Sequence, residues 1–270
     1  MNSLDTLTAR IEGIGFWADG LPSWQAAVDH ARTGAPVAGG GKPAPRMLAP
    51  NERRRAPPSV AVALDVALAA CEAAGREPAA LPSVFASTHG DLAITDYMCT
   101  TLADDPRAIS PTKFHNSVHN AAAGYWTIGA GCLHPATALS AHRASFAQGL
   151  LEALAQLACG EDAVLLAAYD TAGTGPLGAI SQSSGLLGGA LVLSVDAGDD
   201  PDRENSGGIR LRATLVDGDA PAGDGRLSRH AAANAMAPML PLFDALATGG
   251  DLALLHAGHG RALRVELAHG

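Results

Sequence analysis

Residues 141–144, Ala-His-Arg-Ala, lie in the kind of turn at which many enzymes place a reactive side chain. Residues 136–141 are predicted to form a short buried strand, and apolar residues recur every three or four positions from Phe146 to Leu157, which predicts a helix over 145–157. A tight turn between a strand and a helix presents its residue at the helix N-terminus, where an anion is stabilised. Arg143 cannot lose its proton to become a nucleophile, so this turn has the expected geometry for covalent chemistry without the group that performs it.

His115 and His119 have the spacing of two zinc ligands on one face of a helix. In the metalloprotease motif a glutamate follows the first histidine and acts as general base, whereas Asn116 stands at that position here. A third ligand would have to come from a histidine elsewhere in the chain, namely His89, His134 or His142. The sequence therefore favours hydrogen bonding by His115 and His119 within a buried or interfacial helix start, and it predicts neither a metal nor a cofactor.

Several serines lie near these histidines, but their pattern does not favour a hydrolase. Ser140 and Ser145 flank His142, yet the G-x-S-x-G motif is absent and neighbours on one turn seldom reach triad geometry. The remaining candidates are predicted to be loop and turn residues, namely Ser181, Ser183 and Ser184.

The composition excludes some classes of partner. With 27 acidic and 18 basic residues in 270, the formal net charge is −9, which argues against a nucleic-acid or anionic-membrane surface. Four separated cysteines without a C-x-x-C pair suggest reduced, mostly buried thiols. No uninterrupted apolar run reaches about 18 residues and the first residues lack a signal-peptide pattern, so we expect a soluble cytoplasmic protein.

The order of elements predicts an α/β fold with a mainly parallel sheet. The predicted strands are 9–17, 83–88, 136–141, 161–170, 185–195, 209–216, 252–256 and 262–267. The predicted helices are 21–32, 59–74, 92–103, the run capped by Asn116 and Ser117, 145–157 and 227–246. The acidic stretch 196–208 is predicted to divide an N-terminal domain, 1–195, from a C-terminal segment, 196–270, that completes the fold.

Residues 110–154, SPTKFHNSVHNAAAGYWTIGAGCLHPATALSAHRASFAQGLLEAL, resemble the β-ketoacyl-acyl carrier protein synthases. The likeness is greatest to the short chain-length-factor type of ketosynthase-like subunit associated with aryl polyene pathways, and HNSVHNAAAGYW is its most specific part. The resemblance implies a layered thiolase-like α/β/α fold whose second half is abbreviated. It also aligns Arg143 with the nucleophilic cysteine of the family, and the two histidine motifs of the family's second half are missing from 196–270.

The resemblance therefore implies a pseudoenzyme that does not condense acyl groups itself. Such a subunit pairs with an active β-ketoacyl-ACP synthase as a heterodimer, meets acyl carrier protein through that complex, and shapes the acyl pocket in type II fatty acid or polyene biosynthesis. The turn would be a vestigial elbow formed by His142, Arg143 and Ser145. The strand 136–141 would lie beside its counterpart in the partner, and the expected interface and pocket residues are Phe114, His115, Asn116, His119, Asn120, Tyr125, Trp126, Thr137 and Leu139.

Three alternatives stay open. The aromatic residues Phe114, Tyr125 and Trp126 are as typical of a core as of a pocket wall. The run Arg53-Arg54-Arg55 is either a solvated approach to the following helix or a contact for an acidic carrier protein, since arginines pair with phosphate and carboxylate. The chain could also be a stand-alone acyltransferase or thioesterase with His115 or His119 as base, or a homodimeric scaffold.

Overall fold

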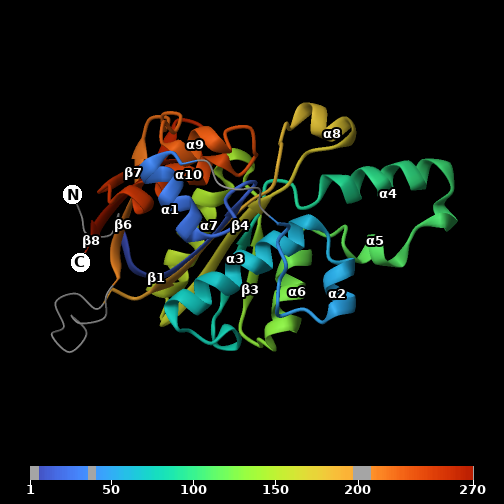
Figure 1. Cartoon of the computed structure of the whole chain (residues 1–270), viewed down its shortest axis with the longest axis horizontal. Helices are drawn as coiled ribbons and strands as arrows, with labels where there is room; N and C mark the ends of the chain where they lie inside the picture. Colours follow the sequence, from blue (N-terminus) through green and yellow to red (C-terminus); the bar gives the residue numbers. More distant parts are fainter. Residues whose placement is uncertain (1–5, 36–40, 197–207, 270) are drawn as a thin grey trace.

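The computed structural model describes residues 6–35, 41–196 and 208–269. In this part of the chain one sheet of eight strands crosses the molecule in the order β3-β2-β4-β5-β1-β6-β8-β7 (Figure 1). The strands are β1 (Thr6–Ala18), β2 (Ser83–Ala86), β3 (Ala136–Leu139), β4 (Ala163–Asp170), β5 (Leu187–Ser194), β6 (Ile209–Asp217), β7 (Leu252–Gly258) and β8 (Arg261–His269). Strands from both sides of the predicted boundary at 196 belong to this sheet, since β6 pairs with β1. Most of the predicted linker, 197–207, lies outside the described residues.

The sheet is mainly antiparallel, so the prediction of a mainly parallel sheet is wrong. Only β2 pairs in parallel, with β3 and with β4, whereas the pairings from β4 through β5, β1, β6 and β8 to β7 are antiparallel. The continuous apolar character of β4 and β5 led to the error. Both strands are buried along their whole length because helices cover both faces of the sheet, and this covering requires apolar residues whatever the strand direction.

Helices cover the two faces and confirm the layered α/β/α architecture (Figure 1). The helices are α1 (Trp24–Thr33), α2 (Pro50–Arg55), α3 (Pro58–Ala74), α4 (Leu92–Asp104), α5 (Pro111–His115), α6 (Ala121–Ala130), α7 (Ser145–Ala158), α8 (Gly175–Ile180), α9 (Arg226–His230) and α10 (Leu240–Thr248). Helices α3 and α6 contact one face, while α1, α7 and α10 pack over the other. No helix in the described ranges is long and apolar enough to cross a membrane.

Two glycines let α3 approach β1 closely. A Cβ atom at Gly15 would lie 1.9 Å from the carbonyl oxygen of Val66, and one at Gly13 would lie 2.1 Å from that of Ala70. Both contacts are with backbone, which cannot move aside as a side chain can. The glycines of the first strand therefore serve close packing between strand and helix.

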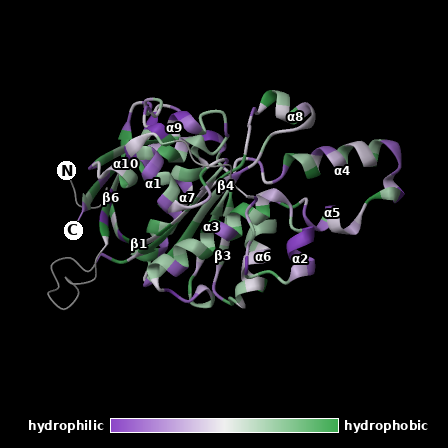
Figure 2. Cartoon of the chain, in the orientation of Figure 1, coloured by the Kyte–Doolittle hydropathy of each residue, from purple (hydrophilic) through white to green (hydrophobic). Residues whose placement is uncertain are grey.

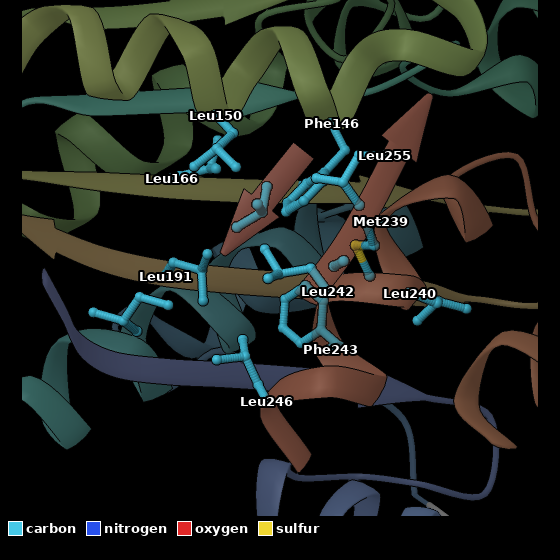
Figure 3. Packing of buried hydrophobic residues seen from close by; sticks show 14 of the residues in the cluster. Phe146, Leu150, Leu166, Leu191, Met239, Leu240, Leu242, Phe243, Leu246 and Leu255 are labelled. Carbon is cyan, nitrogen blue, oxygen red and sulfur yellow. The ribbon is translucent and has the colours of Figure 1, made fainter. Parts of the chain in front are cut away.

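The opposite face holds the larger apolar core (Figure 3). Phe243 of α10 is fully buried, and its ring centroid lies 5.5 Å from that of Phe16 and 6.1 Å from that of Phe146. The predicted helix over 145–157 is confirmed as α7, whose Phe146 and Leu150 point into this core. Because α7 follows the turn at 141–144 directly, its packing fixes the position of that turn against the sheet.

Three local predictions need correction. The helix expected over 227–246 is two helices, α9 and α10, since Pro238 and Pro241 lack the N–H groups that a continuous helix would need. Asn116 is the C-cap of α5, and α6 begins at Ala121 with Asn120 at its N-cap position, so Asn116 and Ser117 do not cap it. The charged run 51–55 is itself helical, as α2.

The last correction concerns the strand expected to be buried over 136–141. It is β3, an edge strand of four residues, and each of them is partly or largely exposed. Its only neighbour in the described sheet is β2. The apolar residues of this stretch therefore belong to an edge strand that no other part of the described chain covers. Beyond it, α4 and α5 form an arm that projects away from the sheet (Figure 1).

Candidate functional site

The turn between β3 and α7 is the strand-to-helix corner that the sequence predicted. Strand β3 ends at Leu139, a 3-10 turn spans His142–Ala144, and α7 begins at Ser145. Arg143 lies in this turn with its side chain exposed. His142 has φ +52°, and among the described residues it is the only non-glycine with a positive φ. Such a conformation costs free energy and is concentrated at functional positions.

Ser145 holds the corner together through its hydroxyl group. Its Oγ accepts a hydrogen bond from the N–H of Ala141 at 2.9 Å and donates one to the carbonyl of His142 at 2.7 Å. The residue is 1% exposed. A buried hydroxyl that both donates and accepts a hydrogen bond is not available to attack a substrate, so Ser145 has a structural role.

No cysteine stands in the corner. The four cysteines lie elsewhere: Cys71 and Cys132 are buried, and Cys99 and Cys159 are exposed. Burial raises the pKa of the Cys71 thiol to about 12, which keeps it protonated and unreactive at neutral pH. The corner therefore carries neither a thiol nor a free hydroxyl within its turn.

A buried carboxylate organises the neighbouring turn, at the end of β2. Asp170 is the last residue of β4 and is fully buried. Its Oδ1 accepts hydrogen bonds from the Ser87 hydroxyl at 2.7 Å and from the N–H groups of Thr88 and His89 at 3.1 and 3.3 Å. Burial raises the pKa of Asp170, although the hydrogen bonds from Thr88 and Ser87 and the charge of His89 oppose this. The parallel pairing of β2 and β4 brings these groups together at the carboxyl ends of both strands.

Two histidines lie beside this turn. The Nε2 atom of His89 lies 3.2 Å from the Ser181 hydroxyl, and that of His119 lies 2.9 Å from the carbonyl of Ser87. Burial lowers the pKa of His89, with further lowering by His142 and His119, while Asp170 raises it. The contact of His89 with Ser181 joins the α8 segment to the end of β2.

A cleft of about 670 Å³ opens beside the corner. Its walls come from the corner, from 180–184, from 220–223, from 232–238 and from β7. His142, Arg143 and His256 all line it. Asn234 shapes one wall, since its amide nitrogen lies 3.3 Å from the carbonyl oxygen of Asp170 and 3.1 Å from that of Ser184. The cleft can accept a ligand considerably larger than a water molecule.

Comparison with known proteins identifies the architecture. A family model described as the N-terminal domain of β-ketoacyl synthases matches residues 24–230. The chain belongs to this family. No curated protein matches the sequence.

Solved structures with a ketosynthase fold are similar over nearly the whole chain. One comes from a ketosynthase, ApeO, in complex with its chain length factor, ApeC, from Xenorhabdus doucetiae. It superposes on this chain with a TM-score of 0.74 at 21% sequence identity, and the match covers 96% of this chain and 99% of that chain. Another comes from the complex AntDE:AntF, a type II polyketide acyl-carrier protein with its ketosynthase. Its TM-score is 0.71 at 10% sequence identity, and the match covers 98% of this chain and 99% of that chain. A third, the ishigamide ketosynthase/chain length factor, has TM-score 0.61 and 15% identity over 91% and 74%. These likenesses confirm the thiolase-like fold.

The β-ketoacyl synthase-like chain brings only some of its predicted site residues together. Helix α5 ends at His115, so His115 and His119 do not share a helix face, and the described residues contain no group of three or more metal-ligating side chains. His115 is exposed, and its ring centroid lies 5.7 Å from that of Tyr125. No serine, threonine or cysteine side chain of the described residues contacts His115 or His119 in the way that a general base requires.

The aromatic residues divide between surface and core. Trp126 is fully buried, with its ring centroid 6.2 Å from that of Phe85, so it is a core residue and presents no surface. Phe114 is 61% exposed on α5, and Tyr125 is partly exposed on α6. Thr137 and Leu139 lie on the edge strand, Asn120 is exposed at the start of α6, and the buried Asn116 reaches the carbonyl of Arg55 at 3.5 Å.

The three arginines of α2 are not equivalent. Arg53 donates to the carbonyl of Leu48 at 3.0 Å and thereby fixes the preceding loop. Arg54 contacts the side chain of Asn51, and both Arg54 and Arg55 are exposed. Helix α2 is the strongly hydrophilic element below the arm in Figure 2. Only Arg54 and Arg55 are free to meet a partner.

Reasoning from the sequence missed Asp170, Asn234 and His256. A signal for Asp170 was present, because an acidic residue at the end of a buried apolar run stands where the carboxyl ends of strands form a site. Asn234 and His256 carry no such signal. They reach the cleft only because the C-terminal part of the chain folds back over the sheet.

Proposed function

We propose that this chain is a non-catalytic ketosynthase-like subunit, of the chain-length-factor kind, that pairs with an active β-ketoacyl-ACP synthase. The observation that carries the proposal is the corner itself. A ketosynthase forms a thioester on a cysteine at this corner, whereas residues 141–145 of this chain offer His142, Arg143 and a buried, doubly bonded Ser145. None of residues 141–145 carries a thiol, which supports the proposal.

The uncovered edge of the sheet supports the pairing. Strand β3 offers unpaired backbone groups, and large apolar side chains beside it are exposed, including Ile128 at 75% on α6 and Leu133 at 98%. Exposed apolar groups beside an open strand edge favour burial against another chain. The proposed interface and pocket residues are Phe114, His115, Asn116, His119, Asn120, Tyr125, Thr137 and Leu139. The similar structures that pair a ketosynthase with a chain length factor add support, because 99% of the ApeO–ApeC chain is spanned by this one.

The role we assign to the subunit is to form part of the wall and floor of a pocket for a growing chain. A hollow of about 640 Å³ lies between the end of β3, α7 and the end of β7; its apolar lining includes Leu139, Ala144 and Leu151, and Gln148 and Glu152 also line it. Apolar lining at the partner edge would limit the length of an acyl chain sterically. The product class we propose is a fatty or polyene chain, with aryl polyene pigments as the specific case, and acyl carrier protein would reach the complex with Arg54 and Arg55 as candidate contacts.

Co-expression with a candidate ketosynthase tests the pairing. We expect a heterodimer on size-exclusion chromatography that elongates carrier-bound acyl groups, while the isolated chain does not. Leu133→Asp should weaken the complex at least about tenfold, because it places a charge in an apolar interface. Leu252→Asp is the matched control, since Leu252 is 44% exposed on β7 at the other edge of the sheet. Equal effects of the two variants would contradict the proposed edge.

The absence of catalysis has its own test. Incubation of the isolated chain with acyl- and malonyl-carrier thioesters should give no condensation product. His142→Cys and Arg143→Cys should also give none, because residues 196–270 lack the family's two histidine motifs. Elongation by the isolated wild-type chain would overturn the proposal.

A further inference from the structure

The cleft beside the corner is lined by cationic and titratable side chains and by no carboxylate. Arg143, His142 and His256 face it from two elements that pack against each other, the corner and β7. None of its described lining residues is an aspartate or a glutamate, although acidic residues outnumber basic ones in the chain by 27 to 18. A concave wall with this distribution attracts anions.

Arg143 differs from most arginines of the sheet and its helices. Arg46, Arg76 and Arg261 each pair with a carboxylate, at 2.7, 2.7 and 3.5 Å. Arg143 has no hydrogen bond or ion pair with any residue that the structure describes. Its five N–H donors can therefore bind a planar carboxylate or a phosphate in a bidentate manner without breaking an existing contact.

The neighbouring groups suit the same ligand. The side chains of His142 and His256 likewise lack a hydrogen-bond partner within the described ranges. Thr88, whose side chain lies beside Asp170, also lines the cleft. His142 has a left-handed φ, which costs free energy. Residues with such strain are concentrated at functional sites, where they serve binding or catalysis and not stability.

The rest of the cleft suits an organic body attached to the anion. Pro238, Pro241 and Leu254 provide apolar surface, and Ser184 and Gln182 provide polar groups. A volume of about 670 Å³ far exceeds what an inorganic ion occupies. We propose that this cleft binds an organic anion, with its carboxylate or phosphate group on Arg143, assisted by His142 and His256, and its aliphatic body along the proline and leucine wall. This site does not depend on the partner subunit.

Isothermal titration of the full-length isolated chain with octanoate, octyl phosphate and octanamide tests the proposal. We expect at least one of the two anions to bind and neutral octanamide to bind at least about tenfold more weakly. Binding of octanoate alone identifies a carboxylate ligand, and binding of octyl phosphate alone identifies a phosphorylated one.

Variants then assign the contact. Arg143→Ala should raise the Kd of the anion at least about tenfold, since a charge-assisted pair is lost, and Arg143→Lys should have an intermediate effect. Arg212→Ala is the control, because Arg212 is exposed on β6 and does not line the cleft. Thermal melts of each variant establish that it is folded. The proposal is overturned if neither anion binds, if octanamide binds as tightly as the anions, or if Arg143→Ala and Arg212→Ala change the Kd equally. A chain that binds the anion and fails to pair with a ketosynthase would contradict the proposed function alone.

Discussion

Replacement of Asp170 should separate the contribution of its hydrogen bonds from that of its charge. Asp170→Ala leaves the Ser87 hydroxyl and the N–H groups of Thr88 and His89 without their acceptor. Each unsatisfied buried donor costs about 1–3 kcal/mol, and the contact with His89 is the longest, so we expect a loss of about 3–5 kcal/mol. Asp170→Asn retains one oxygen that can accept from all three donors, although its amide group replaces the Oδ2 atom that lies 3.0 Å from the Thr88 nitrogen, and it should cost only about 1–2 kcal/mol.

Urea unfolding followed by circular dichroism measures both variants. The m-values should match that of the wild type, so that the midpoints report stability. The reasoning would be refuted by an Asp170→Ala variant that loses less than about 1 kcal/mol, or by an Asp170→Asn variant that loses as much as Asp170→Ala.

The ionisation of Asp170 adds a pH dependence. Because burial raises its pKa in the folded state, the folded protein binds this proton more tightly than the unfolded chain does. The stability gained in this way is fully present below the ordinary pKa of 3.8 and is lost as the pH rises through the folded-state value. Wild-type stability should therefore decline more than that of Asp170→Asn as the pH rises above about 4.

Three further variants test other parts of the structure. Ser145→Ala should cost about 2 kcal/mol in urea unfolding because two buried hydrogen bonds are lost, and a loss under about 0.5 kcal/mol would contradict the role given to this hydroxyl. His142→Gly should stabilise the protein by about 0.5–1 kcal/mol in thermal melts, since glycine adopts φ +52° without strain and this gain exceeds the entropy that glycine adds to the unfolded chain; a lower Tm would show that the strain is smaller than this entropic cost. Burial raises the pKa of Glu12, but hydrogen bonds from Arg76 and Ser194 and the charge of Arg76 outweigh burial and leave this pKa below its usual value. Arg76→Ala should therefore cost about 1 kcal/mol at pH 7, and the difference should begin to shrink near the ordinary pKa of 4.5 and disappear as the pH falls through the lower folded-state pKa; a difference that persists in strong acid would argue against an ionic origin.

The helices could largely be predicted from the sequence because their signals are local. Helix α3 ends at Gly75, which has φ +63°, and α7 follows from the spacing of its apolar residues. The corner at Arg143 could be predicted because it requires only a strand, a turn and a helix in succession. The sheet direction could not, since β1, β5 and β6 pair across gaps of more than a hundred residues, and a fully covered strand has the same composition in either direction.

The site was predictable only where its residues are neighbours in the chain. His142 and Arg143 were found, while Asp170, Asn234 and His256 depend on tertiary folding. The spacing of His115 and His119 does not place them on one helix face, because an i, i+4 spacing indicates a shared face only while the helix continues, and α5 stops at His115. The exposure of β3 at the edge of the sheet could not be predicted either. Apolar residues predict that a strand is buried, but not whether the surface that covers it belongs to the same chain.

The position of β1 has a consequence for biosynthesis. β1 precedes the other described strands in the sequence, yet it is an interior strand whose two neighbours, β5 and β6, begin only at Leu187 and Ile209. Until synthesis has reached β5 at Leu187, β1 lacks both of its partner strands, and its apolar residues stay accessible to chaperones and to aggregation. Slow translation or a truncated message should therefore yield insoluble fragments, whereas a circular permutant that begins after β5 would relieve this delay.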